Sequence, residues 1–107
     1  MPDVTLTVAG TSFHQEAVRS LSKETPVKLE PDPENEYDPY AVKVITSGSK
    51  ELIGYIPASL SRNFTDLITE TGLIPEISIY SLDWYTNKVG RKTCGVVITI
   101  VYPKELE

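Results

Sequence analysis

The sequence predicts a mainly β fold, in which a small antiparallel β-barrel, closed or partly closed, carries two α-helices. Three observations lead to this prediction. Short stretches rich in β-branched residues recur along the chain, hairpin turns join several of them, and two segments show the apolar spacing of helices. Two helices are too few to provide the crossovers of a parallel sheet, so the strands should pair antiparallel. A barrel is favoured over an open sheet because closure removes the exposed edges of short strands.

The first strand is predicted over residues 3–9, because apolar residues there alternate with threonines at period two. A short helix through Leu21 follows, and we expect Ser12 to cap it together with Gln15 in a capping box. Pro26 prevents this helix from continuing.

The middle of the chain is predicted to form a short strand, a long loop and a hairpin. Residues 27–29 have the composition of a strand, and three prolines place residues 30–40 in a loop. The β-branched stretches 41–46 and 51–56 flank a turn at 47–50 that contains glycine, which is typical of a β-hairpin.

The last third of the chain is predicted to form a second helix and a closing hairpin. Apolar residues from Leu60 to Thr71 recur on one helical face, with Ser59 as the expected N-cap and Gly72 as the C′ residue. Two stretches rich in isoleucine, valine, tyrosine and threonine, 75–84 and 92–102, predict the two strands of the hairpin.

Length and charge limit the possible functions. A chain of 107 residues fits one domain, so we expect residues 1–107 to fold as a single unit. Fifteen acidic and ten basic residues give a net charge of −5. This charge argues against a protein that coats long nucleic acids, because neutralising many phosphates requires a basic surface. It leaves open a contact with one or two terminal nucleotides.

The single cysteine, Cys94, and the single histidine, His14, provide neither an internal disulfide nor a zinc site. We interpret Cys94 as a small buried residue of a strand and His14 as a surface residue. The sequence shows no signal peptide and no apolar run of membrane-spanning length, so we expect a cytoplasmic location and no membrane partner.

The loop at 30–40 is strongly acidic. Set on the EF-hand frame, four acidic residues fall at ligand positions: Asp32, Glu34, Glu36 and Asp38. However, Tyr37 replaces the glycine of the sharp turn and Lys43 replaces the bidentate glutamate. We therefore interpret the segment as a solvated acidic loop, with weak divalent binding left open. No set of nucleophile, base and metal ligands can be assembled, so we expect no enzyme and no cofactor.

Three segments together resemble the HIRAN domain family: 8–13 (VAGTSF), 32–44 (DPENEYDPYAVKV) and 53–57 (IGYIP). The most specific part is the pattern of Asn, any residue, Tyr, Asp, two residues and Ala-Val at 35–42. The resemblance covers about residues 5–102, so we expect a protein that consists of this one domain.

This resemblance implies an OB-like barrel with added helices, and a nucleic-acid-binding module that recognises the 3′-hydroxyl end of single-stranded DNA. It assigns Asp38 as acceptor of a hydrogen bond from the 3′-hydroxyl and Tyr37 as a stacking partner of the terminal nucleotide. Asn35 would fix the loop or contact the ligand, and Tyr40 or Phe13 would add aromatic surface. Alternatively, Asp38 could be only a turn-forming residue that binds local backbone amides.

The chain departs from the pattern of the DNA-binding relative at two places. Residues 7–10 (TVAG) lack the expected aromatic wall and its cation, and the expected phosphate-binding lysine falls near Pro57 or Ala58. Tyr55 either faces the pocket or packs within the hairpin. Four cations could replace the missing ones at phosphates: Arg62, Lys88, Arg91 and Lys92.

Two functions are therefore open from the sequence. The first is a module that binds single-stranded DNA ends, or another nucleic acid, in DNA repair or replication-fork processing, with a helicase or nuclease acting in trans. The second is a protein-interaction or regulatory domain that keeps the HIRAN fold without binding DNA ends, which the acidic balance favours.

Overall fold

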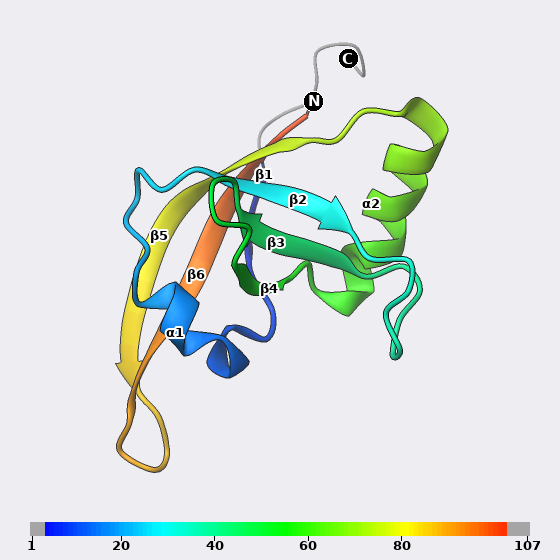
Figure 1. Cartoon of the computed structure of the whole chain (residues 1–107). Coiled ribbons are helices and arrows are strands. Elements are labelled where there is room, and N and C mark those ends of the chain that lie inside the picture. The colour runs from blue at the N-terminus through cyan, green and yellow to red at the C-terminus, as the bar shows by residue number, and fades with distance from the viewer. Residues whose placement is uncertain (1–3, 103–107) are drawn as a thin grey trace.

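The structure is a computed structural model that describes residues 4–102. Within these residues, six antiparallel strands form one sheet, accompanied by a short 3-10 turn and two helices (Figure 1). The strands are β1 (Val4–Thr7), β2 (Val27–Pro31), β3 (Val42–Thr46), β4 (Leu52–Tyr55), β5 (Glu76–Thr86) and β6 (Lys92–Val101). The 3-10 turn η1 spans Thr11–Phe13, and the helices are α1 (Gln15–Val18) and α2 (Ala58–Thr71).

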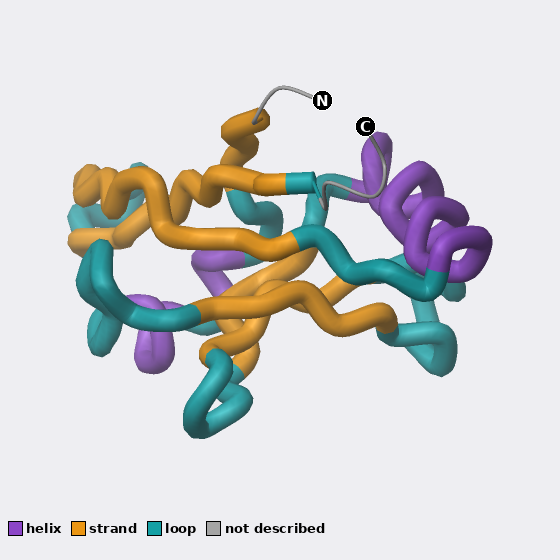
Figure 2. Tube along the Cα trace, turned by 90° about the horizontal axis from the view of Figure 1, so that it is seen from above, coloured by secondary structure: helices purple, strands orange, loops and turns teal. Residues whose placement is uncertain are grey.

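The sheet curls so that its two edge strands meet. Its strand order is β1-β6-β5-β2-β3-β4, and the chain just after β1 pairs with the end of β4. Ala9 N donates to Tyr55 O at 2.8 Å, and Tyr55 N donates to Ala9 O at 2.9 Å. Figure 2 shows the strands in two facing layers, with α2 at one end. The predicted mainly β, OB-like and partly closed barrel with two helices is confirmed.

Closure of the sheet depends on a glycine. A Cβ atom added at Gly54 would overlap the carbonyl oxygen of Ala9 and would lie 2.7 Å from Cγ1 of Val8. Gly54 is buried in β4, beside Tyr55, whose backbone forms the bridge. The bridging backbones can therefore approach this closely only because residue 54 has no side chain.

The hydrophobic core lies inside the curled sheet. Alternate residues of β6 are completely buried, as the period-2 pattern predicts: Cys94, Val96, Ile98 and Ile100. Val18 of α1 and Phe64 of α2 belong to the same cluster of buried side chains. Phe64 also stacks on Tyr102, with ring centroids 6.3 Å apart. The helices therefore complete the core that the sheet alone leaves open.

The predicted capping box of the first helix is wrong. Ser12 lies within η1, and α1 begins after His14 with no side-chain capping bond and ends at Val18. Gln15 uses its amide elsewhere. Its Nε2 donates to Thr11 O at 2.8 Å and to Cys94 O at 3.1 Å, while its Oε1 accepts from Cys94 N at 2.8 Å. A contact across the fold thus replaces the local cap.

Two further boundaries differ from the prediction. Ser59 is not the N-cap of α2, because the helix starts at Ala58 behind Pro57 and has no side-chain cap. The second strand extends to Pro31, which pairs with Val42 although proline has no N–H to donate. Gly72 is confirmed at the helix end, where its φ is 72°.

The bounds of the first strand also differ from the predicted 3–9, since β1 spans Val4–Thr7. The predicted start of the first strand at residue 3 lies outside the described residues. Beyond β1, Val8 still donates its N–H to Val96 O at 2.8 Å, so the backbone stays in contact with β6 as far as the bridge.

We expect Gly54→Ala to lower the free energy of unfolding by about 1–3 kcal/mol or more, because the new methyl group forces the closing backbones apart. Gly48→Ala is the matched control: a Cβ there meets nothing within 4 Å, and the φ of Gly48 is not positive. It should change stability by about 0.5 kcal/mol or less. Urea unfolding of both variants measures the difference, and equal stabilities would contradict the role of Gly54.

Candidate nucleic-acid interface

The loop between β2 and β3 is organised by the side chain of Asn35. Its Oδ1 accepts hydrogen bonds from the backbone N–H of Tyr37 at 2.9 Å and of Asp38 at 3.1 Å. Its Nδ2 donates to Oδ2 of Asp32 at 3.1 Å. Asparagine suits this position because its short amide can bind both backbone and side-chain groups. Asn35 therefore fixes the backbone turn that carries Tyr37 and Asp38.

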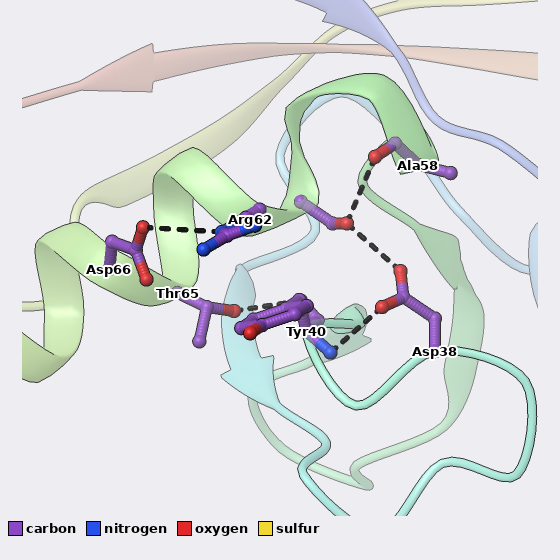
Figure 3. Close-up of polar contacts among 7 residues, drawn as sticks. Asp38, Tyr40, Ala58, Arg62, Thr65 and Asp66 are labelled. Carbon is purple, nitrogen blue, oxygen red and sulfur yellow. Dashed lines mark hydrogen bonds and ion pairs between the residues drawn. The ribbon is translucent and has the colours of Figure 1, made fainter.

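Asp38 connects the loop to α2. Its Oδ1 accepts from Tyr40 N at 2.8 Å, and its Oδ2 accepts from Ser61 Oγ at 3.0 Å (Figure 3). Ser61 is buried and also lies 3.1 Å from the carbonyl oxygen of Ala58, so its single proton is shared between two acceptors. The bond from Tyr40 agrees with the alternative interpretation of Asp38 as a turn-forming residue.

A pocket of about 370 Å³ opens beside this loop. Its volume lies within the usual range for ligand sites. Its walls come from three places in the sequence: the closing bridge, the acidic loop and the start of α2. The lining residues are Ala9, Asn35, Tyr37, Asp38, Ala41, Tyr55, Ile56 and Ala58. Four residues predicted from the sequence, Asn35, Tyr37, Asp38 and Tyr55, are therefore brought together.

The two tyrosines and the aspartate of the pocket differ in exposure. Tyr37 is 92% exposed, so its ring has no packing role and both faces are open to a ligand. Asp38 and Tyr55 are half-buried. The pocket thus combines an open aromatic ring with a carboxylate whose position is fixed by two hydrogen bonds.

Tyr40 and Arg62 lie next to the pocket, on the side of α2. The guanidinium carbon of Arg62 lies 5.0 Å from the ring centroid of Tyr40, within the range of a cation–π contact (Figure 3). Thr65 Oγ1 donates to Tyr40 O at 2.7 Å, and Arg62 Nε lies 3.8 Å from Oδ2 of Asp66. Tyr40 and Arg62 therefore form an exposed pair beside Asp38.

The remaining predicted residues lie elsewhere. Phe13 is 85% exposed on η1, and it is not among the described residues that line the pocket. Arg91 and Lys92 lie at the end of the β5–β6 hairpin, which Figure 1 shows on the opposite side of the molecule from the β2–β3 loop. Each borders a separate depression there. The structure does not bring these residues to the pocket.

The structure also places the single cysteine and the single histidine of the chain. Cys94 is completely buried, as expected, and its Sγ lies 3.5 Å from Gly95 O. Burial, with a smaller effect of the Asp83 carboxylate, raises the pKa of the Cys94 thiol above its ordinary value. Such a thiol is a poor nucleophile at neutral pH. His14 is half-buried rather than fully exposed.

Across residues 4–102, no three histidine, cysteine or acidic side chains lie where together they could hold a metal ion. In the same part of the chain, no helix has the length and apolar character needed to cross a membrane.

Ser61 and Ala9 belong to the site but were not predicted from the sequence. Ser61 is a polar residue three positions before Phe64, on the buried face of α2. A polar residue on an apolar helical face requires a hydrogen-bond partner, and this signal could have identified it. Ala9 reaches the pocket only through the bridge with Tyr55, for which the local sequence has no signal.

Comparisons with known proteins agree with this fold. A family model described as the HIRAN domain matches residues 2–95. The crystal structure of the HIRAN domain of human HLTF is similar, with a TM-score of 0.61 and 20% identity, covering 96% of this chain and 78% of that one. A crystal structure of a protein from Lactobacillus plantarum has a TM-score of 0.56 and 16% identity, covering 94% of this chain and all of that one. No curated protein sequence matches the chain.

We expect Ser61→Ala to destabilise the fold by about 1–2 kcal/mol, because a buried hydroxyl that donates to a carboxylate is lost. Ser59→Ala is the matched control in the same helical turn, since Ser59 is exposed and does not cap α2. It should change stability by about 0.5 kcal/mol or less. Thermal and urea unfolding compare the two variants, and an equal loss from both would refute a specific role of Ser61.

Proposed function

Because the chain belongs to the HIRAN domain family, a family of nucleic-acid-binding modules, we propose that it recognises the 3′-hydroxyl end of single-stranded DNA. The proposed site is the pocket between the β2–β3 loop, the closing bridge and α2. The chain acts there as a binding module rather than as an enzyme. The observation that carries the proposal is the meeting of an open tyrosine ring and a fixed carboxylate at one pocket.

The carboxylate of Asp38 is suited to recognising a free 3′ terminus. Two hydrogen bonds fix its position, and its two oxygens together can accept about four hydrogen bonds, so acceptor capacity remains for a ligand. A carboxylate accepts a hydrogen bond from a hydroxyl group but repels a phosphate. Asp38 would therefore favour a strand that ends in the pocket over one that continues through it.

Tyr37 would stack on the terminal nucleotide, and the Tyr40–Arg62 pair would hold the nucleotide that precedes it. Stacking on Tyr37 is tolerant of base identity, since every base has a π face. Arg62 is exposed and its only ion pair in the described residues is the 3.8 Å contact with Asp66, so its guanidinium can also reach a phosphate. The ring of Tyr40 holds the guanidinium in place through the 5.0 Å cation–π contact.

The net charge of −5 is consistent with a short contact at a strand end. A footprint with one or two phosphates releases few counterions, so binding is weak compared with that of proteins that wrap long DNA. We place this activity in DNA repair or replication-fork processing, with a helicase or nuclease acting in trans on the end that the pocket holds.

One observation favours a second candidate function. Ala9 lines the pocket, in the segment where the resemblance to the DNA-binding relative leads us to expect an aromatic wall. A domain that kept the fold but lost this wall could instead bind a protein partner or act as a regulatory domain. Stable capture of a defined partner protein, with no oligonucleotide binding at low salt, would select this function.

We expect the wild-type chain to bind a 3′-hydroxyl oligonucleotide about tenfold more tightly than its 3′-phosphate form, a difference of about 1.4 kcal/mol. Asp38→Asn should remove most of this preference, because the neutral amide no longer repels phosphate. Its Oδ1 can still accept from Tyr40 N, so the loop should remain in place. Fluorescence anisotropy with short labelled oligonucleotides measures all four affinities.

Equal binding of both ends by the wild-type chain would refute end recognition. Absence of binding at micromolar protein and low salt would refute the proposed function altogether. A 5′-phosphate on the same oligonucleotide is the control, since the pocket is proposed to discriminate only at the 3′ end.

We expect Tyr37→Ala to weaken binding of single-stranded DNA by about 1–3 kcal/mol through loss of stacking. Tyr37→Phe keeps the aromatic ring and should retain near wild-type affinity. Because Tyr37 is 92% exposed, neither change should affect the unfolding transition. Anisotropy titrations and urea unfolding separate the two effects, and equal affinities of the Ala and Phe variants would argue against stacking.

A further inference from the structure

The β5–β6 hairpin extends away from the core as an arm, here defined as residues 83–93 (Figure 1). Large aromatic side chains remain exposed on it: Trp84 is 54% exposed and Tyr85 is 51% exposed. Neither residue is needed for the described core, whose β5 members are Ile77 and Ile79, with Leu82 packed against them. The arm therefore presents aromatic surface that the fold itself does not use.

One face of the arm combines an aromatic ring with a cation. Trp84 pairs with Cys94 and Thr86 pairs with Lys92 in the strand register. Directly paired residues, and residues two apart on a strand, point to the same face, so Trp84, Thr86 and Lys92 share one face. Together with Tyr85 they line a depression of about 510 Å³.

Positive charge gathers at this end of an acidic chain. The arm and the adjoining residues 15–19 hold four cations, Arg19, Lys88, Arg91 and Lys92, and two carboxylates, Glu16 and Asp83. These residues carry a net charge of +2. Since the whole chain carries −5, the remaining residues carry −7. Such a separation of charge favours the approach of an anionic ligand to the arm.

The tip of the arm is held in one conformation by Asn87. Its Oδ1 accepts from Val89 N at 3.1 Å and from Arg91 N at 3.0 Å, and its backbone N donates to Arg91 O at 2.9 Å. Arg19 Nη2 also donates to Lys92 O at 3.1 Å, which ties the chain after α1 to the arm. These bonds fix the backbone that carries Lys88, Arg91 and Lys92, so that less backbone ordering is needed on binding.

We propose that the arm is a second nucleic-acid-binding surface, which takes an internal segment of a single strand with bases stacked on Trp84 and a phosphate on Lys92 beside it. Arg91, which borders the neighbouring depression, would contact a further phosphate of the same strand. The proposal rests on the proposed function for the class of ligand but requires neither the 3′ pocket nor a strand end. Aromatic faces beside cations match the alternation of bases and phosphates. An apolar protein partner would instead bury these cations without counter-charges, which is unfavourable.

The experiment uses the intrinsic fluorescence of the chain. Trp84 is the only tryptophan, so its emission reports contact at the arm directly. A circular single-stranded oligothymidylate has no 3′ end and serves as the probe. We expect it to quench Trp84 emission at low salt, with an affinity about tenfold lower in the double variant Arg91→Gln/Lys92→Gln.

Two controls make the outcome specific. The double variant Lys28→Gln/Lys50→Gln removes the same charge from exposed positions on β2 and on the β3–β4 turn, and should bind the circle nearly as well as wild type. Asp38→Asn should also leave quenching by the circle unchanged, so failure of the 3′ pocket and failure of the arm are distinguishable.

Three results would overturn the proposal. One is unchanged Trp84 emission on addition of the circle at low salt. Another is an equal loss of affinity in both double variants, which would show that only overall charge matters. The third is a change of emission with protein concentration alone, accompanied by dimerisation in sedimentation equilibrium, which would show that a second copy of the chain covers the arm.

Discussion

The close approach of Ala9 and Tyr55 is the contact on which the rest of the structure depends. It joins the two edges of a six-stranded sheet within the described residues, and thereby turns an open sheet into a curled barrel with an enclosed core. It is possible only because Gly54 leaves room for the opposing backbone. Ala9 and Tyr55 also form one wall of the pocket, so the contact that closes the barrel also builds part of the site.

The second wall of the pocket is built from polar contacts. Asn35 fixes the turn, and Asp38 links that turn to α2 through Ser61. Asp38 is therefore both a structural residue and the proposed recognition group. These two roles do not exclude each other, since a carboxylate held by two donors has lost its freedom of motion but not its charge or all its acceptor sites. Fixing it in this way should help it discriminate between chain ends, because a mobile carboxylate could move away from an approaching phosphate.

Much of this fold follows from local patterns in the sequence. The alternation of apolar residues in 92–102, the glycine-containing turn at 47–50 and Gly72 after α2 each determine structure within a few residues, and these predictions agree with the structure. The failed prediction for Gln15 has a tertiary cause. Gln15 was expected to cap a helix but binds Cys94, 79 positions away, and no local pattern indicates such a partner. Likewise, Asn35, Tyr37 and Asp38 were expected from family resemblance, whereas Ser61 and Ala9 join them only through tertiary contacts.

In the proposed function, the pocket formed by barrel closure holds the end of a single strand. Backbone amide NMR with a short 3′-hydroxyl oligonucleotide tests it most directly, because each amide reports its own surroundings. We expect the largest shift changes on the amides of residues 35–38, Tyr40, Ala41, Tyr55 and Ala58, which surround the pocket; Pro39 has no N–H and gives no signal. Saturating shift changes that leave 35–41 unaffected and occur only elsewhere in the chain would contradict it.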